Sequence, residues 1–188
     1  YGALGFTGSV NTKAKTPHID SLFMDGVHFP EGYASHATCA PSRGGLMTGR
    51  AQARFDHETL PAGNEDRIKN KYGVKTSELM IPALMKKGGY STAMWGKWHL
   101  GLDTEFQPNS RGFDYFMGYR GSCGFYQFSS QVKDAKKGKD LKAISADEKP
   151  QLDIVRNGQP LRLDGYLTEH FTNDASKWIK KQAKSDQP

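Results

Sequence analysis

Apolar residues recur at helical spacing in two parts of the chain. Near its beginning, Thr16-Pro17 supplies a cap and a first helical turn, Asp20 complements the helix dipole, and Gly26 ends the helix. Near its other end, five apolar side chains share one face of a second predicted helix: Leu167, Phe171, Ala175, Trp178 and Ile179.

The middle of the chain alternates between helical and extended patterns. Residues 82–87 predict a short helix that carries two lysines in its last turn and stops at Gly88-Gly89. Residues 90–94 then predict a strand, and residues 27–29 alternate like another short strand. A helix that enters a strand through a tight glycine turn is typical of an α/β sheet.

Turn residues and polar stretches predict a hairpin and two loops. Residues 154–161 favour a hairpin, because Asn157-Gly158 suits a type I′ turn and Pro160 restricts the second strand to a sheet edge. Residues 54–72 are polar and predict a surface loop. Residues 132–150 carry six lysines without apolar periodicity and predict a solvated loop, with polyanion binding as the alternative.

The run of residues 37–50 predicts a short helix with a cysteine at its start. Pro41 suits the first turn, and Gly49 can take the left-handed conformation that ends a helix. Cys39 then lies where unpaired N–H groups and the positive end of the helix dipole favour an anion and lower a thiol pKa. Arg43, one turn further on, can direct its guanidinium to the same place. The alternative is a buried structural cysteine, with the arginine in a surface ion pair.

A second stretch, residues 95–101, follows the strand predicted just before it. Gly96, Lys97 and His99 lie at the carboxyl end of that strand, where open α/β sheets place their sites. In extended geometry Lys97 and His99 project to the same side. A cation beside a titratable donor can hold an anionic oxygen and a leaving oxygen.

Composition suits a globular protein and leaves several functions open. The 188 residues are 36% hydrophobic and 24% charged, and no apolar run reaches the length of a membrane span. The net charge of +6 would attract polyanions such as sulfated glycans or nucleic acid, and it serves solubility equally well.

Cys39 and Cys123 could form one disulfide, unless Cys39 is the reactive residue. His18, His28 and His36 have no acidic or histidine partner at metal-ligand spacing and are interpreted as structural.

These stretches together resemble the signatures of the type I sulfatases, the formylglycine-dependent family of the alkaline-phosphatase superfamily. The first signature is Cys-x-Pro-Ser-Arg, two free positions, two apolar residues and Thr-Gly. All of its positions stand in this chain: Cys39, Pro41, Ser42, Arg43, Leu46, Met47, Thr48 and Gly49. Gly89-Tyr90-x-Thr92 followed by residues 96–99 resembles the second signature, with Trp95 where a smaller apolar residue is usual. Residues 111–118 are similar to the segment that follows it.

The resemblance implies a fold and a reaction. The fold is an α/β sandwich of the alkaline-phosphatase type, with a mostly parallel sheet between helices that is incomplete in this chain. Residues 1–188 would be part of a single catalytic domain, without its start and its carboxyl-terminal portion. Its substrates would be sulfate esters of carbohydrates or aryl alcohols, sulfated glycans among them, and no nucleic acid or membrane span is implied. The family is periplasmic, secreted or lysosomal.

The resemblance also implies roles for four residues. Cys39, oxidised to formylglycine by a maturation enzyme, would be the nucleophile and a metal ligand. Arg43 would stabilise the hydrated aldehyde, Lys97 would hold sulfate oxygens, and His99 would contact the diol or the sulfate. Arg120, Cys123 and Tyr126 are further candidates for the substrate cleft.

A divalent ion, usually Ca²⁺, belongs to the same implied site. The family's paired metal-binding aspartates would precede Tyr1-Gly2, and its remaining ligands would follow Pro188, so the isolated segment is expected to be inactive. Two alternatives remain open. One is a phosphonate or phosphodiester hydrolase of the same superfamily. The other is a non-catalytic binder of acidic glycans in which Cys39 stays unmodified.

Overall fold

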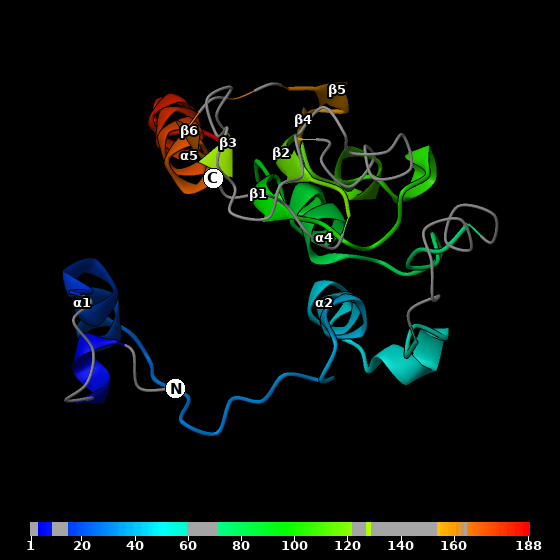
Figure 1. The fold of residues 1–188 in the computed structure, drawn as a ribbon, viewed down its shortest axis with the longest axis horizontal. Coiled ribbons are helices and arrows are strands. Elements are labelled where there is room, and N and C mark those ends of the chain that lie inside the picture. Colours follow the sequence, from blue (N-terminus) through cyan, green and yellow to red (C-terminus); the bar gives the residue numbers. More distant parts are fainter. Residues whose placement is uncertain are drawn as a thin grey trace, which may run out of the picture. The chain divides into compact units, whose positions relative to one another are not determined.

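The structure is a computed structural model that describes residues 4–8, 15–59, 71–121, 127–128, 154–161, 163 and 165–188 (Figure 1). It divides the chain into two compact units, Tyr1–Ala34 and Ser35–Pro188. The lysine-rich segment 132–150, Cys123 and Tyr126 lie outside the described residues. Within the described ranges, no helix is long and apolar enough to cross a membrane.

The first unit contains the 3-10 helix η1 (Gly5–Thr7) and helix α1 (Pro17–Asp25). Phe6 of η1 stacks on Phe23 of α1 with ring centroids 4.0 Å apart, and this contact holds the two elements together. The strand predicted at residues 27–29 is wrong, because these residues form no ladder with a neighbouring segment. Three alternating residues cannot satisfy their backbone groups as a strand without such a partner.

Thr16 precedes α1 as predicted, but its side chain does not cap the helix. Its hydroxyl donates to Oδ1 of Asp20 at 3.0 Å and accepts the backbone N–H of Gly5 at 2.9 Å. The hydroxyl therefore ties η1 to α1 instead of satisfying a free N–H of the helix. Gly26 ends the helix, as predicted.

The second unit is built on a four-stranded mixed sheet in the order β1 (Ala93–Lys97), β2 (Tyr115–Tyr119), β4 (Ile154–Arg156) and β5 (Gln159–Pro160). Strands β1 and β2 are parallel, whereas β2–β4 and β4–β5 are antiparallel. A separate antiparallel pair joins β3 (Gln127–Phe128) and β6 (Gly165–Tyr166). The α/β class is confirmed, but the described sheet is not mostly parallel, because only one of its three strand pairings, β1–β2, is parallel.

Strand β1 starts three residues later than predicted. The backbone N–H of Ser91 donates to the carbonyl of Pro188, and that of Thr92 donates to Oδ2 of Asp114. These bonds lie outside the ladder, so the ladder begins only at Ala93. The predicted hairpin is confirmed: Asn157 and Gly158 have φ of 49° and 80°. Its second strand, β5, which contains Pro160, is an edge of the sheet.

Helices and 3-10 turns connect and cover the strands. They are α2 (Cys39–Thr48), η2 (Gln52–Phe55), α4 (Ile81–Lys87), η3 (Thr104–Phe106), η4 (Pro108–Arg111) and α5 (Leu167–Gln182). The predictions of α2, α4 and α5 are confirmed. The loop predicted at residues 54–72 overlaps the end of η2, and residues 60–70 lie outside the described ranges.

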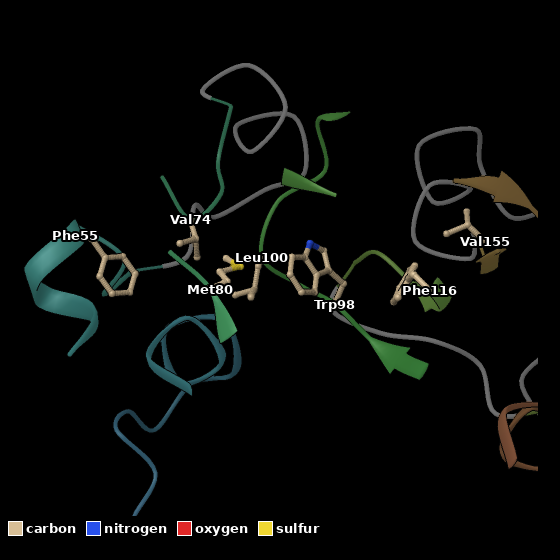
Figure 2. Packing of buried hydrophobic residues seen from close by; sticks show 7 residues of the cluster. All are labelled: Phe55, Val74, Met80, Trp98, Leu100, Phe116 and Val155. Carbon is tan, nitrogen blue, oxygen red and sulfur yellow. The ribbon is translucent and has the colours of Figure 1, made fainter. Parts of the chain in front are cut away.

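The main core collects side chains from most of these elements. Figure 2 shows its seven members: Phe55, Val74, Met80, Trp98, Leu100, Phe116 and Val155. Trp98 is fully buried, and its indole N–H donates to the carbonyl of Phe106 at 2.8 Å. The segment after β1 is therefore fixed in the core on both sides of His99, which matters for the site.

Asp174 anchors α5 to the sheet. Its Oδ1 accepts the indole N–H of Trp95 at 2.8 Å and the hydroxyl of Tyr115 at 2.6 Å, and its Oδ2 accepts Arg156 at 2.8 Å. Burial raises the pKa of this carboxyl, but the three donors outweigh it and leave the pKa below its ordinary value. Burial and the same contact raise the pKa of Tyr115 to about 12. The large Trp95 is thus accommodated by a hydrogen bond from its indole N–H to Asp174 on α5.

Replacement of Asp174 by alanine is expected to lower the free energy of unfolding by about 2–4 kcal/mol, because Trp95 and Tyr115 lose their acceptor. Asp174→Asn keeps one oxygen and should lose less. Urea denaturation of both variants measures the difference, and the exposed Asp186→Ala is the matched control. Equal stability of Asp174→Ala and the control would contradict the anchoring role.

Candidate functional site

Helix α2 begins at Cys39, whose side chain is exposed and is not in a disulfide. Thr38 is the N-cap residue, and its carbonyl accepts the N–H of Ser42 at 3.1 Å. Gly49 ends the helix in the left-handed conformation with φ of 65°, and its N–H donates to the carbonyl of Gly45. The predicted helix with a cysteine at its start is confirmed. The interpretation of a buried structural cysteine is wrong.

Two glycines let α2 pack closely on the rest of the unit. A Cβ on Gly44 would lie 2.8 Å from Cδ2 of His57, and one on Gly45 would lie 2.5 Å from Oγ of Ser35. His57 is only 1% exposed and stacks on Tyr72 with ring centroids 4.9 Å apart. His57 was not among the residues predicted from the sequence. Adjacent glycines inside a predicted helix were the available indication that a bulky neighbour packs there.

Arg43 joins α2 to the end of β1. Its Nε donates to the carbonyl of Trp98 at 2.7 Å, and its terminal nitrogen donates to the carbonyl of Lys97. Burial lowers the pKa of the guanidinium, while Tyr119 and Cys39 act in the opposite direction through their charges. The arginine thus lies within electrostatic range of Cys39 and binds the backbone of the second predicted stretch. It is not in the surface ion pair that was the alternative.

The backbone around Lys97 departs from the extended geometry predicted from the sequence. Gly96 has φ of 102° and His99 has φ of 61°, so side chains do not alternate regularly across this segment. The prediction that the side chains of Lys97 and His99 project to the same side depended on strand alternation, and this segment does not have that alternation. His99 is 5% exposed and has a left-handed backbone conformation, which is unfavourable for this residue type. The surrounding structure must therefore stabilise that conformation.

Backbone bonds to the end of β2 hold this segment in place. The N–H of Trp98 donates to the carbonyl of Tyr119 at 3.0 Å, and that of His99 donates to the carbonyl of Arg120 at 2.9 Å. Of the three further cleft candidates, only Arg120 is described, and it lies directly beside the predicted site. Arg43 thus brings together two sequence stretches more than forty residues apart, residues 37–50 and residues 95–101. The β1–β2 pairing then holds the second stretch beside the end of β2.

The described side chains do not form a calcium site. Within the described residues, no three His, Cys, Asp or Glu side chains lie close enough to share a metal ion. Ca²⁺ takes six to eight oxygen ligands, which Cys39 alone does not supply.

Of the histidines interpreted as structural, His28 packs edge-on against Phe23, with ring centroids 5.0 Å apart.

The geometry defines an α/β protein with an exposed cysteine at a helix start, and Arg43 of that helix binds backbone carbonyls at the carboxyl end of a parallel strand. The chain belongs to the sulfatase family, because the family's sequence model matches residues 3–188.

Particular relatives agree with this assignment. N-acetylgalactosamine-6-sulfatase of Rattus norvegicus is 35% identical over 140 residues, which cover 71% of this chain and 25% of that protein. The enzyme of the same name from Homo sapiens is 29% identical over an alignment of 203 residues, which covers 98% of this chain and 34% of that protein. The crystal structure of Ps i-CgsB matches with a TM-score of 0.82 and 30% identity, over 100% of this chain and 40% of that one. The chain thus spans about a quarter to a third of the curated relatives' length.

Proposed function

We propose that residues 1–188 form part of a single catalytic domain of a carbohydrate sulfatase in which a maturation enzyme oxidises Cys39 to formylglycine. Family membership over residues 3–188 supports the class of reaction. The observation that carries the proposal is the exposed Cys39 at the start of α2, joined through Arg43 to the backbone of Lys97. An exposed thiol is open to modification, and the start of a helix suits an anionic substrate.

The proposed chemistry depends on the second oxygen that formylglycine gains. Hydration turns the aldehyde into a gem-diol, one hydroxyl of which attacks sulfur while the ester alcohol leaves with a proton. The resulting sulfate hemiacetal then loses the proton of its second hydroxyl. Sulfate leaves by C–O cleavage, and the aldehyde is restored. A serine ester has no second hydroxyl and would have no such exit.

The residues of the site take roles that fit their positions. Arg43, held by the carbonyls of Trp98 and Lys97, provides a fixed positive charge near the diol. Lys97 supplies a second cation for the sulfate oxygens, and His99 contacts the diol or the sulfate. The Ca²⁺ typical of the family would need ligands beyond the described side chains.

The proposed substrates are sulfate esters of carbohydrates. Relatives that match this chain carry the name N-acetylgalactosamine-6-sulfatase. A second crystal structure of Ps i-CgsB, 29% identical, contains k-i-k-neocarrahexaose. These names support a sugar substrate and leave the particular sugar open.

Mass spectrometry of the Cys39 peptide tests the proposal on the full-length protein produced with a formylglycine-generating enzyme. We expect the mass of an aldehyde and reaction with a hydrazide probe. A free thiol in active protein would contradict the proposed nucleophile, and a free thiol in inactive protein that binds acidic glycans would favour the non-catalytic alternative. Competition between sulfate and phosphate ester substrates separates the remaining alternative, a phosphonate or phosphodiester hydrolase.

Replacement of Lys97 by alanine is expected to weaken transition-state binding by about 2–4 kcal/mol, because a charge-assisted contact to the sulfate oxygens is lost. The measurement is kcat/KM of the mature protein with an aryl sulfate. Lys87→Ala, at the end of α4, is the matched control. If both variants kept wild-type kcat/KM, Lys97 would have no contact with the reacting group.

A further inference from the structure

Contacts with the sheet define the packing face of helix α5, which is orange to red in Figure 1. Leu167 is fully buried, and Phe171 packs against the same cluster of buried residues. Trp178 meets Trp95 edge-on with ring centroids 5.7 Å apart, and Asp174 accepts the indole N–H of Trp95. Each residue advances about 100° around an α-helix, so these four side chains of α5 fall within an arc of about 60°.

Four lysines form a separate row on the second half of α5 and its end, which we call the lysine stripe. They stand at positions i, i+3, i+4 and i+7, within an arc of about 100° that does not overlap the packing face. Lys184 follows the last helical residue, and its N–H still donates to the carbonyl of Lys181 at 3.3 Å. The stripe is about 10 Å long. Its members, all exposed, are Lys177, Lys180, Lys181 and Lys184.

Acidic side chains of α5 do not neutralise the lysine stripe. Glu169 lies in the first turn of the helix, and three donors from the sheet occupy the carboxylate of Asp174. Residues 175–185 contain four lysines and no acidic residue, and Asp186 follows them. Among the residues that the structure describes, no ion pair includes a member of the stripe. The stripe therefore presents four positive charges to solvent.

The helix dipole explains only part of this arrangement. The negative end of the dipole favours cations in the last turn, which contains Lys180 and Lys181, but its effect does not extend to Lys177 one turn earlier. Like charges three or four residues apart repel each other on a helix. A partner with several negative charges would relieve that repulsion, and one small anion would relieve it less.

The composition of the stripe favours a soluble polyanion over a lipid surface. Helices that bind membranes place large apolar side chains beside their basic residues, where these can enter the lipid. Ile179 is the large apolar residue of α5 that is 58% exposed, and it lies outside the arc of the stripe. The stripe thus offers charge without an apolar anchor.

The stripe is also separate from the proposed nucleophile. Trp178 contacts Trp95 in the first part of β1, and Pro188 accepts the N–H of Ser91, which precedes β1. The candidate site lies at the opposite end of this strand, after Lys97. An anion on the stripe would therefore not be the group that reacts.

We infer that the lysine stripe of α5 binds the polymer chain of a sulfated polysaccharide through sulfate groups other than the one that is hydrolysed. The inference rests on the proposed function, because a carbohydrate sulfatase acts on substrates that carry such groups. Several weak charge contacts along one chain raise the local concentration of substrate without a specific pocket. The stripe then favours polymeric over small substrates.

Binding of the full-length protein to dextran sulfate tests the inference, with uncharged dextran as the reference polymer. The triple variant Lys177→Gln/Lys180→Gln/Lys184→Gln keeps good helix formers and removes three charges from the stripe. We expect its affinity for dextran sulfate to fall about tenfold at about 0.1 M salt and its salt dependence to become less steep. Neither protein should bind dextran.

The matched control is Lys15→Gln/Lys71→Gln/Lys87→Gln, which removes the same net charge from exposed lysines elsewhere. Its affinity for dextran sulfate should stay within about twofold of the wild type. Equal losses in the two triple variants would show an effect of net charge alone and would overturn the inference. Tighter binding of duplex DNA than of dextran sulfate, lost in the stripe variant, would assign the surface to nucleic acid and would also overturn it.

Two further measurements separate the stripe from a structural or catalytic role. Hydrolysis of an aryl sulfate by the mature protein should be the same in both triple variants, and a loss confined to the stripe variant would place the lysines at the reacting group instead. A lower urea midpoint in the stripe variant than in the control would show that the lysines pair within the protein. Either result would overturn the inference. Failure of the proposed function would appear differently, as a wild type without aldehyde or turnover, and would leave the dextran sulfate binding unchanged.

Discussion

Cys39→Ser is expected to abolish turnover while leaving the fold intact. The side chain is exposed and outside any disulfide, so the change should alter the free energy of unfolding by less than about 0.5 kcal/mol. A serine can accept the sulfuryl group but has no second hydroxyl to expel it. Hydrolysis of an aryl sulfate should therefore fall by more than about a thousandfold.

Mass spectrometry after incubation with substrate distinguishes the reason for this loss. Cys39→Ser should accumulate a sulfate ester at this position, whereas the matched Cys39→Ala should be equally inactive and gain no mass. Turnover by Cys39→Ser at a rate near that of the wild type would show that the reaction needs no diol. The proposed nucleophile would then be wrong.

Arg43→Lys is expected to damage both stability and activity. A lysine keeps the charge but has one nitrogen, so it cannot reach both carbonyls that Arg43 binds, those of Lys97 and Trp98. One buried carbonyl would lose its donor, which should lower the free energy of unfolding by about 1–3 kcal/mol. The end of β1 would also shift relative to α2, and kcat/KM should fall by about a hundredfold.

Urea denaturation and steady-state kinetics measure these two effects. Arg54→Lys, an exposed arginine in η2, is the matched control and should change neither quantity appreciably. If Arg43→Lys lost activity at wild-type stability, the arginine would act on the substrate alone. Wild-type values of both would mean that its two backbone bonds do not hold the site together.

Local patterns predicted the elements well wherever one residue type decides the backbone. Gly49 and the Asn157-Gly158 pair adopt positive φ as expected, and α2 and the hairpin follow from them. Those patterns did not predict where β1 begins, because the bonds of Ser91 and Thr92 come from segments distant in sequence. The three residues 27–29 were misassigned for the related reason that strand pairing depends on a partner.

For the candidate site too, one part could be predicted from the sequence and another part could not. Its residue types could be read from the two signature stretches, but the contact that joins them could not. Arg43 was expected to serve Cys39, and the structure shows that it also binds two backbone carbonyls after β1. Lys97 and His99 were expected to follow strand alternation, which the positive φ of Gly96 and His99 interrupts. His57 carried no catalytic pattern, since its role is packing under Gly44.

The buried His57 has a consequence for the acidity that this domain tolerates. Burial lowers its pKa to about 4, against about 6.5 for an unfolded chain. The unfolded state therefore binds a proton more readily, and stability that is fully present above pH 6.5 is lost as the pH falls toward 4. Over that interval the folded imidazole stays neutral, so the support beneath α2 keeps its shape while the margin against unfolding narrows. A host compartment of moderate acidity would therefore lower the free energy of unfolding before it changed the charge of this buried imidazole.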